Sequence, residues 1–433
     1  MLALLPLLAL SAGLPVKSLD SLLDEASRTR GGTATAAVVR VRDGAVLWEH
    51  DGWRRMLPAS TQKVLAAAAL RELLGKDRTL PTRLLRPGHQ PISGSTLPGN
   101  LIIEGGGDPA LARGSDSAAL DLLARGLRAR GIRKVRGQLV LRDPLLKPAD
   151  PLWPDSWDWA NSLSDCDGAP STGLSVDGNC PGDISQPRPY RSVAKAFRAA
   201  LVRQGISVGG SDRIEPGTSS PASDSVLAVH ASAPLDSLLR QALWKSSNHD
   251  METFGLVAGR GDANSSRQAG LLRVRKVLAS LGLDTLQNNL VDQCGLSRKN
   301  MLSAEAMAKV LARIARSPSL DIFPLLPSPG EGTLKTRFKR TLPEGCELRA
   351  KTGSLDGTSA LVGRLVPPQG DTLVFVLFFQ GYAGPAAPIR FAQDQIVGLL
   401  AGGSVVAPLP SDTAAAPPRP PKPLRPRNAL QEP

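Results

Sequence analysis

The sequence predicts an α+β fold in which one antiparallel sheet, built from both ends of the chain, is flanked by helices. Three observations support this fold class. The chain opens with an amphipathic segment and two β-rich runs, it closes with two more β-rich runs and an apolar helical segment, and a long stretch with helical character lies between them. This order of elements is typical of an α+β arrangement.

The N-terminal elements follow from periodicity and turn chemistry. Residues 17–28 place apolar side chains at the i, i+3, i+4, i+7 spacing of an amphipathic helix. Two β-rich runs, 33–41 and 45–49, are separated by an Asp-Gly dipeptide, which predicts a hairpin. The next segment, 60–74, contains four consecutive alanines, so we expect a largely buried helix there.

The C-terminal elements complete the predicted sheet. The runs 359–366 and 372–380 flank a Pro- and Gly-containing turn and predict a second hairpin. A helix is expected over residues 387–400. The last residues, 405–433, are rich in proline and poor in apolar side chains, so we expect a disordered tail.

The middle of the chain is less regular and predicts an insertion. Residues 78–230 contain short β-like pieces, among them 101–103 and 138–141, punctuated by glycine and proline. We therefore expect an inserted domain over 78–230, between two parts of one main domain, 15–77 and 231–404. A length of 433 residues is consistent with more than one domain.

Composition excludes several classes of protein and limits the partners. With 42% hydrophobic and 21% charged residues, the chain is neither disordered nor a polytopic membrane protein. Its net charge of +13 either reflects a solvated, Arg-rich surface or favours an anionic partner, such as a wall polymer or a membrane surface. Two Tyr and eight Phe in the whole chain offer few platforms for base stacking, so we expect no nucleic-acid partner.

The N-terminus predicts export. Residues 1–14 are mostly apolar, too short to span a bilayer, and contain small residues at a possible cleavage point. The basic residues that usually open a signal peptide are missing, so a buried terminal helix is the alternative. We expect a signal peptide and a periplasmic or otherwise extracytoplasmic location.

Export has consequences for the cysteines. In an oxidising compartment four cysteines allow two disulfides with three connectivities: Cys166, Cys180, Cys294 and Cys346. The absence of a CxxC spacing and the presence of only four histidines argue against a zinc site. We expect no metal and no cofactor.

A serine and a lysine at the start of the predicted buried helix suggest covalent catalysis. Ser60 and Lys63 are three residues apart, so one helical turn brings both to the same face. A serine hydroxyl is a weak nucleophile until a base takes its proton, and a lysine serves if burial and nearby positive charge keep it neutral. The N-terminus of the helix also favours the oxyanion that forms when a carbonyl is attacked.

Ser-x-x-Lys alone is a weak signal, since Ser192 and Lys195 match it inside an ordinary surface-helix pattern. Further along the chain lie Ser246-x-Asn248 and the rarer Lys351-Thr352-Gly353, which precedes a β-rich run. The ordered set Ser-x-x-Lys, Ser-x-Asn, Lys-Thr-Gly is the signature of penicillin-recognising serine enzymes.

The spacing between Ser60 and Ser246 is long, because the predicted insertion lies between them. With this spacing the chain resembles the penicillin-binding protein 4 family of D-alanyl-D-alanine carboxypeptidase/endopeptidases (peptidase family S13). Additional matching motifs run through most of residues 17–400: Leu101–Pro109, Gly131–Gly137, Lys245, Gly295–Arg298 with Asn300, Gly332–Leu334 with Arg337, and Arg349–Gly353. The resemblance implies a penicillin-binding-protein/β-lactamase-like sheet flanked by helices, with a large insertion. It also implies an exported serine peptidase that cleaves peptidoglycan stem peptides and is inhibited covalently by β-lactams.

The resemblance assigns a role to each motif residue. It implies that Ser60 is the acylated nucleophile and Lys63 its base. Ser246 would relay a proton to the leaving amine, and Asn248 would hold the substrate amide. Lys351 would keep Lys63 neutral and, with Thr352, hold the substrate carboxylate. Past Gly353, the N–H of Ser354 would complete the oxyanion hole with that of Ser60.

One motif departs from the family pattern, and two other functions stay open. The usual Asp-Gly-Ser-Gly is Asp292-Gln293-Cys294-Gly295 here, and we hypothesise that Cys294 pairs with Cys346. Cys166 and Cys180 resemble a disulfide loop of the family. A β-lactamase-like hydrolase and a non-enzymatic cell-wall-binding protein are the alternatives, although the long insertion argues against the first and the complete motif set against the second.

Overall fold

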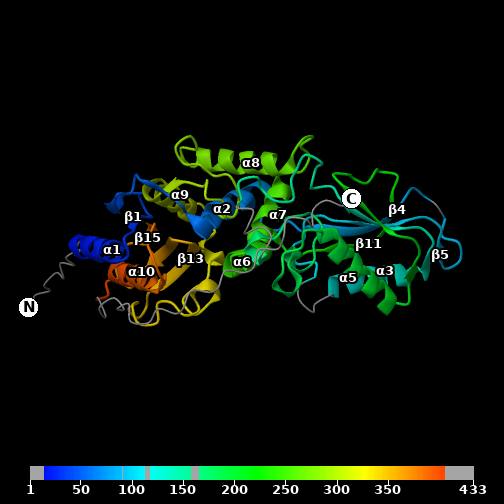
Figure 1. Ribbon diagram of the computed structural model, residues 1–433. Coiled ribbons are helices and arrows are strands. Elements are labelled where there is room, and N and C mark those ends of the chain that lie inside the picture. The colour runs from blue at the N-terminus through cyan, green and yellow to red at the C-terminus, as the bar shows by residue number, and fades with distance from the viewer. Residues whose placement is uncertain (1–13, 90, 113–117, 158–164, 405–433) are drawn as a thin grey trace, which may run out of the picture.

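The computed structural model describes residues 14–89, 91–112, 118–157 and 165–404 (Figure 1). Residues 1–13, which make up nearly all of the predicted signal peptide, and the predicted Pro-rich tail, 405–433, lie outside these ranges. No helix in the described ranges is long and apolar enough to cross a membrane.

Both ends of the chain form one five-stranded antiparallel sheet, as the sequence predicted. Its order is β13-β14-β15-β1-β2. The bounds are β1 Thr33–Arg40, β2 Val46–His50, β13 Glu347–Leu355, β14 Thr358–Val366 and β15 Leu373–Gln380. Both predicted hairpins are confirmed, and the first turns at Gly44, whose φ of 79° suits glycine.

The sheet is apolar on both faces, so its strands read as continuous hydrophobic runs. Along β15, Phe375 and Leu377 face a cluster with α1 (Val16–Arg30) and α10 (Ala387–Leu400). Val374 and Val376 face the opposite cluster, which the helical layer completes. This alternation follows from the two-residue period of a strand.

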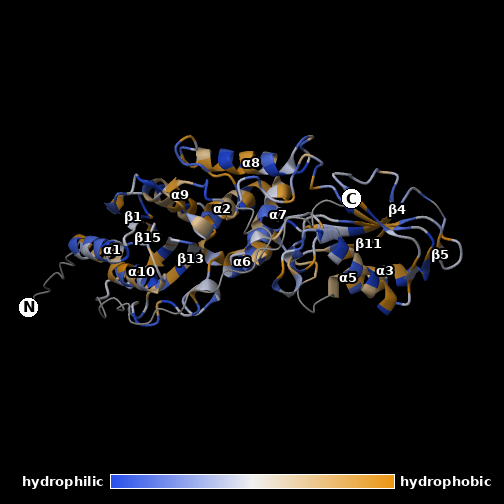
Figure 2. Ribbon diagram, viewed as in Figure 1, coloured by the Kyte–Doolittle hydropathy of each residue, from blue (hydrophilic) through white to orange (hydrophobic). Residues whose placement is uncertain are grey.

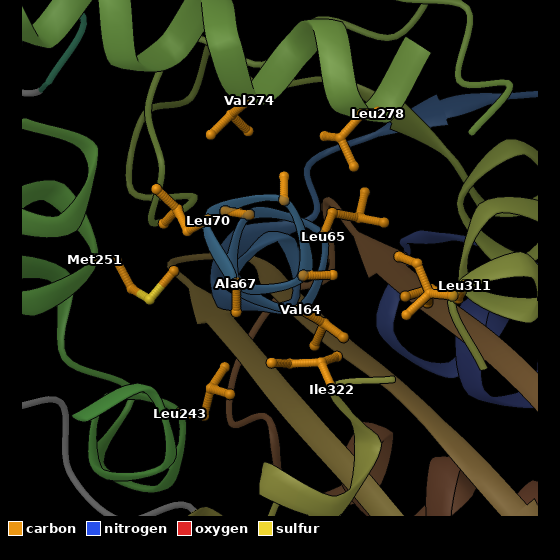
Figure 3. Close-up of a cluster of buried hydrophobic side chains, with 14 of the residues drawn as sticks. Val64, Leu65, Ala67, Leu70, Leu243, Met251, Val274, Leu278, Leu311 and Ile322 are labelled. Carbon is orange, nitrogen blue, oxygen red and sulfur yellow. The ribbon is translucent and has the colours of Figure 1, made fainter. Parts of the chain in front are cut away.

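The helical layer surrounds α2 (Gln62–Leu74), whose residues 62–70 are all buried. Figure 3 shows α2 with Val64, Leu65, Ala67 and Leu70 facing side chains from the neighbouring elements. The other helices of this layer are α6 Leu235–Lys245, α7 Asn248–Ala258, α8 Ser266–Ser280 and α9 Ala304–Arg316. The alanine run predicted burial correctly, because small side chains let helices approach from several sides.

A second lobe is built around a mixed sheet, ordered β10-β8-β6-β4-β11. Its strands and helices are β4 Pro81–Arg86, β6 Leu101–Glu104, β8 Leu139–Asp143, β10 Asp212–Pro216, β11 Ser225–Ala231, α3 Ala118–Ala129 and α5 Pro189–Arg203. The strands predicted at 101–103 and 138–141 are therefore confirmed. Figure 2 shows that α3 and α5 carry both hydrophilic and hydrophobic residues, as helices that cover a sheet should.

The remaining elements are short. Three two-residue strands form a small sheet: β5 Thr96–Leu97, β7 Lys134–Val135 and β9 Ser207–Val208. Another pair is β3 Arg55–Met56 with β12 Leu302–Ser303. The 3-10 turns are η1 Ala59–Thr61, η2 Cys166–Gly168, η3 Asp177–Asn179, η4 Pro181–Asp183, η5 Phe323–Leu325 and η6 Gly332–Leu334.

The cysteines confirm one expected pairing and contradict the other. Cys166 and Cys180 form a disulfide, whereas Cys294 and Cys346 are free, so the hypothesis that they pair was wrong. Cys294 is fully buried in the cluster on the α2 side of the sheet, and Cys346 packs against the cluster on the other side. Because the sheet lies between these clusters, the two thiols cannot meet.

Candidate active site

Ser60 lies in the turn that leads from β3 into α2. Ala59, immediately before it, has a φ of 46°, in the left-handed region that non-glycine residues rarely adopt. The turn is fixed on either side, because Thr61 Oγ1 donates to the carbonyl of Pro58 and Gln62 Nε2 donates to the carbonyl of Asp292 at 2.6 Å. Such a strained, well-supported turn is typical of a functional position.

Lys63 lies one turn after Ser60, and its side chain is fully buried. Its Nζ lies 2.8 Å from Ser60 Oγ, 2.6 Å from Asn248 Oδ1 and 2.7 Å from the carbonyl oxygen of Cys294. Three short contacts fix the amine beside the hydroxyl. The pair has the geometry of a nucleophile and its base.

Ser246 and Asn248 come from the junction of α6 and α7. Ser246 has a φ of 58° and ends α6, while Ser247 caps α7 by accepting from Asp250 N. This sharp junction directs the Ser246 hydroxyl to Lys351 Nζ, 2.8 Å away. Asn248 is held by the η2 turn, because its Nδ2 donates to the carbonyl of Asp167 at 2.8 Å.

Strand β13 brings the Lys-Thr-Gly motif against Ser60. Lys351 is fully buried, while Thr352 is partly exposed and Ser354 is exposed. A Cβ atom on Gly353 would lie 2.8 Å from the carbonyl oxygen of Pro58 and 3.1 Å from Ser60 N. Only glycine lets the strand come this close to the Ser60 backbone.

The structure brings all eight residues selected from the sequence to this one region, on four elements: Ser60, Lys63, Ser246, Asn248, Lys351, Thr352, Gly353 and Ser354. The competing pair, Ser192 and Lys195, lies on α5 of the other lobe, and Lys195 is exposed to solvent. Burial beside an acceptor network therefore distinguishes Lys63 from Lys195.

Burial lowers the pKa of both lysines in the site. For Lys63, acidic groups nearby, Cys294, Asp292, Asp167 and Glu252, oppose the lowering. The pKa of Lys351 falls well below its usual value, first through burial and then through the charge of Lys63. The two amines repel each other, so a charge on one disfavours a charge on the other, while the acidic groups favour a charge on Lys63.

A loop behind Lys63 contains residues that the motif analysis missed. Glu252 lies one helical turn after Asn248, and its Oε1 accepts from Gln293 N at 2.7 Å and from Cys294 N at 3.0 Å. These bonds fix the peptide whose carbonyl faces Lys63. The four-residue spacing from Asn248 was the one signal in the sequence that could have identified Glu252.

Asp292 is the centre of the same loop. It accepts hydrogen bonds from Gln62, Trp157 and Asn300 side chains and from the backbone of Gly295 and Ser297. Gly295 is required there, because a Cβ atom would lie 1.9 Å from the carbonyl oxygen of Ala59. The departure from the family motif leaves both the aspartate and the glycine in place.

Glu252, Asp292 and Cys294 also lie close enough to share a cation, with ligand atoms within 4.8 Å of one another. Their chemistry does not fit that use. The carboxylate oxygens already accept backbone and side-chain N–H groups, and burial raises the pKa of the Cys294 thiol well above its usual value. A protonated thiol is a poor metal ligand.

Comparison with known proteins agrees with this geometry. A family model described as the D-Ala-D-Ala carboxypeptidase 3 (S13) family matches residues 16–184 and 182–402. A carboxypeptidase DacB of Mycolicibacterium smegmatis is 32% identical, over 85% of this chain and 80% of its own length. The D-alanyl-D-alanine carboxypeptidase of Actinomadura sp. (strain R39) is 27% identical, over 89% of this chain and 84% of its own.

Solved structures show the same fold. The crystal structure of penicillin binding protein 4 (dacB) from Haemophilus influenzae superposes with a TM-score of 0.76 at 25% sequence identity, covering 90% of this chain and 99% of that one. A second structure of that protein, in complex with a β-lactam, gives a TM-score of 0.68. The match extends over both lobes.

Proposed function

The chain belongs to the D-Ala-D-Ala carboxypeptidase 3 (S13) family, and from this premise we propose that Ser60 is the acylated nucleophile of a serine-type D-alanyl-D-alanine carboxypeptidase acting on peptidoglycan stem peptides. One observation carries the assignment of Ser60. Its hydroxyl lies 2.8 Å from the amine of a fully buried lysine, Lys63, and Asn248 and Cys294 hold that amine in place.

Acylation begins when the neutral Lys63 amine takes the proton of Ser60 Oγ. The oxygen attacks the carbonyl carbon of the penultimate D-alanine, and the negative charge moves to the carbonyl oxygen. We assign the N–H groups of Ser60 and Ser354 as the donors that stabilise this oxyanion. The close approach of Gly353 to Ser60 N supports that assignment.

Collapse of the intermediate requires a proton on the leaving amine. We assign Ser246 as the relay that passes the proton taken up by Lys63 to this amine, because its hydroxyl lies 2.8 Å from Lys351 Nζ, two residues before Asn248. The C–N bond breaks, D-alanine leaves, and the ester on Ser60 remains. Water then attacks the ester, Lys63 accepts its proton, and Ser60 Oγ recovers a proton as the ester bond breaks.

Substrate binding favours the neutral form of Lys63, the proposed base. The terminal carboxylate of the substrate would lie against Lys351 and Thr352 and would favour a charged Lys351. A charged Lys351 then disfavours a second charge on Lys63, which becomes the neutral base that acylation needs. The substrate carboxylate therefore selects the reactive protonation state as well as the position of the peptide.

The same site accounts for two further proposals. A cross-linked peptide in place of the terminal D-alanine would make the reaction an endopeptidase cleavage, and a β-lactam would acylate Ser60 and remain bound. The Haemophilus influenzae relative has been crystallised with a β-lactam. Since peptidoglycan lies outside the cytoplasmic membrane, we propose an extracytoplasmic location.

Intact-mass spectrometry after brief exposure to benzylpenicillin, followed by digestion, tests the assignment. A stable adduct on the peptide that contains Ser60 is expected. Penicillin recovered as its hydrolysed acid, with unmodified protein, would favour a β-lactamase instead. Intact penicillin with unmodified protein would favour a wall-binding protein without activity.

A further inference from the structure

A groove on the second lobe is lined by cations from α5. Two adjoining cavities, of about 280 Å³ and 620 Å³, share Arg191 and Ile214 in their walls. Arg188 also lines the first cavity, and Lys195 and Arg198 line the second. Because the two cavities share these wall residues, we name them together the α5 groove; α5 lies on the lobe that carries β4 and β11 (Figure 1).

Charge compensation differs along α5. In its C-terminal half, Arg198 pairs with Asp212 at 2.7 Å and Arg203 pairs with Asp121 at 2.8 Å. Arg188, Arg191 and Lys195 are exposed, and no carboxylate in the described ranges forms an ion pair with any of them. Three positive charges therefore line the groove without an ion-pair partner in the described ranges, since Asp212, the carboxylate in its wall, pairs with Arg198.

The spacing of these charges indicates an elongated ligand. Arg191 and Lys195 are four residues apart on one helix, where like charges repel and destabilise the helix until an anion lies between them. Arg188 immediately precedes α5, and from Pro189 to Lys195 the helix rises roughly 9 Å. A ligand that meets all three must carry anionic groups several ångströms apart, as a polymer with repeated carboxylates or phosphates does.

The walls of the groove discriminate among polyanions. The aromatic residue in its lining, Tyr190, is buried and donates to Asp143 Oδ2 at 2.9 Å, so it offers no face for a nucleic-acid base. The depression is concave, whereas a bilayer presents a flat surface. Leu152, Pro187 and Ile214 add an apolar wall that suits the methyl groups of acetylated sugars and alanine side chains.

We propose that the α5 groove is an exosite for polymeric peptidoglycan, in which carboxylates of stem peptides bind Arg188, Arg191 and Lys195. This inference rests on the proposed function, because it names the polymer whose stem peptides the site at Ser60 cleaves. Stem peptides and phosphodiester wall polymers both carry closely spaced anionic groups, which is the chemistry that the groove would recognise. Free phosphodiester wall polymers are the other source of that chemistry, and the experiment separates the two.

Co-sedimentation with purified peptidoglycan sacculi, stripped of other wall polymers, tests the exosite. The Ser60→Ala background prevents degradation of the sacculi. In that background the triple variant Arg188→Gln, Arg191→Gln, Lys195→Gln is expected to bind on the order of tenfold more weakly, since each exposed charge contact contributes modestly. A matched control neutralises Lys276, Lys339 and Arg340, three exposed cations outside the groove, and should bind as the parent does.

Activity assays separate the exosite from the catalytic site. With Ser60 present, the groove variant should keep the turnover of a short soluble peptide and its penicillin labelling, but lose turnover of intact sacculi. Equal binding by the groove variant and the control would overturn the proposal, as would groove-dependent binding to a soluble phosphodiester polymer without binding to stripped sacculi. Loss of penicillin labelling in the wild-type protein would instead overturn the proposed function, because sedimentation does not depend on acylation.

Discussion

The amine of Lys63 lies 2.6 Å from the side-chain oxygen of Asn248, a residue 185 positions away in the chain. This bond joins α2, which begins two residues after Ser60, to α7, which forms the facing wall. Asn248 in turn donates to the carbonyl of Asp167 in the loop closed by the Cys166–Cys180 disulfide. The site therefore depends on three segments that only the folded chain brings together.

Ser60→Ala should abolish the benzylpenicillin adduct, because it removes the attacking oxygen. Ser60 is partly exposed, so we expect the melting temperature to change little. Intact-mass spectrometry and a thermal melt measure the two effects. Ser192→Ala is the matched control for the competing motif and should label fully, while labelling that persists in Ser60→Ala would move the nucleophile elsewhere.

Lys63→Met should slow acylation by about 10²- to 10⁴-fold, the usual contribution of a general base. Methionine preserves most of the buried side-chain volume, so a loss of labelling rate reflects chemistry more than collapse of the core. Stopped-flow acylation with a fluorescent penicillin gives the rate. Lys195→Met, on the exposed face of α5, should acylate at the wild-type rate, and the opposite pattern would show that the wrong Ser-x-x-Lys was chosen.

Much of this fold was predictable from the sequence, because local patterns specify the elements concerned. The hairpin turns, the amphipathic α1 and the alanine-rich α2 each follow from short-range signals. The motif residues could be selected because the proposed chemistry requires their residue types at short spacings. Burial then distinguishes Lys63 from Lys195, and burial depends on tertiary contacts that spacing does not contain.

The rest of the site could not be predicted, because it consists of long-range backbone contacts. The carbonyls of Cys294 and Asp167 hold Lys63 and Asn248, and a backbone carbonyl leaves no mark in the sequence. The proposed Cys294 pairing with Cys346 was wrong for a related reason. Proximity to one active-site motif in sequence says nothing about which side of the sheet a thiol occupies.

Gly353→Ala should slow acylation by about 100-fold, since displacements near 1 Å at a catalytic site have effects of that size. The new methyl group would lie 2.8 Å from the carbonyl oxygen of Pro58, so β13 or the Ser60 turn must move. Ser354→Ala is the control. It retains the backbone N–H assigned to the oxyanion hole and should acylate near the wild-type rate, so equal rates in both variants would contradict the close-approach argument.

The thiols give a direct test of the disulfide assignment. Alkylation in denaturant without reductant should modify two cysteines, Cys294 and Cys346, and leave Cys166 and Cys180 unmodified. Two Cys-to-Ser substitutions at Cys166 and Cys180 should lower the free energy of unfolding by about 3 kcal/mol, because a loop of this size is released in the unfolded state. A single modified thiol, or none, in the unreduced protein would contradict the assignment.

Glu252→Gln should change the pH dependence of stability in a defined direction. Burial, assisted by the charge of Asp292, raises the pKa of Glu252 from 4.5 to about 7. The folded state therefore holds this proton more tightly than the unfolded state. The stabilisation is fully present below pH 4.5 and is lost as the pH rises towards about 7, by an amount on the order of 3 kcal/mol. The glutamine side chain of the variant would not titrate but would still accept from the backbone N–H groups of Gln293 and Cys294.

Urea unfolding at pH values from 5 to 8 measures this difference, with the variant losing less stability across the range than the wild type. The same substitution has a kinetic readout. The Glu252 carboxylate raises the pKa of Lys63, so its removal should shift the rise of acylation rate with pH to lower pH while Lys63 keeps its contacts. Parallel stability curves with an unshifted acylation profile would show that Glu252 acts on neither, and that the Cys294 carbonyl is held by the loop alone.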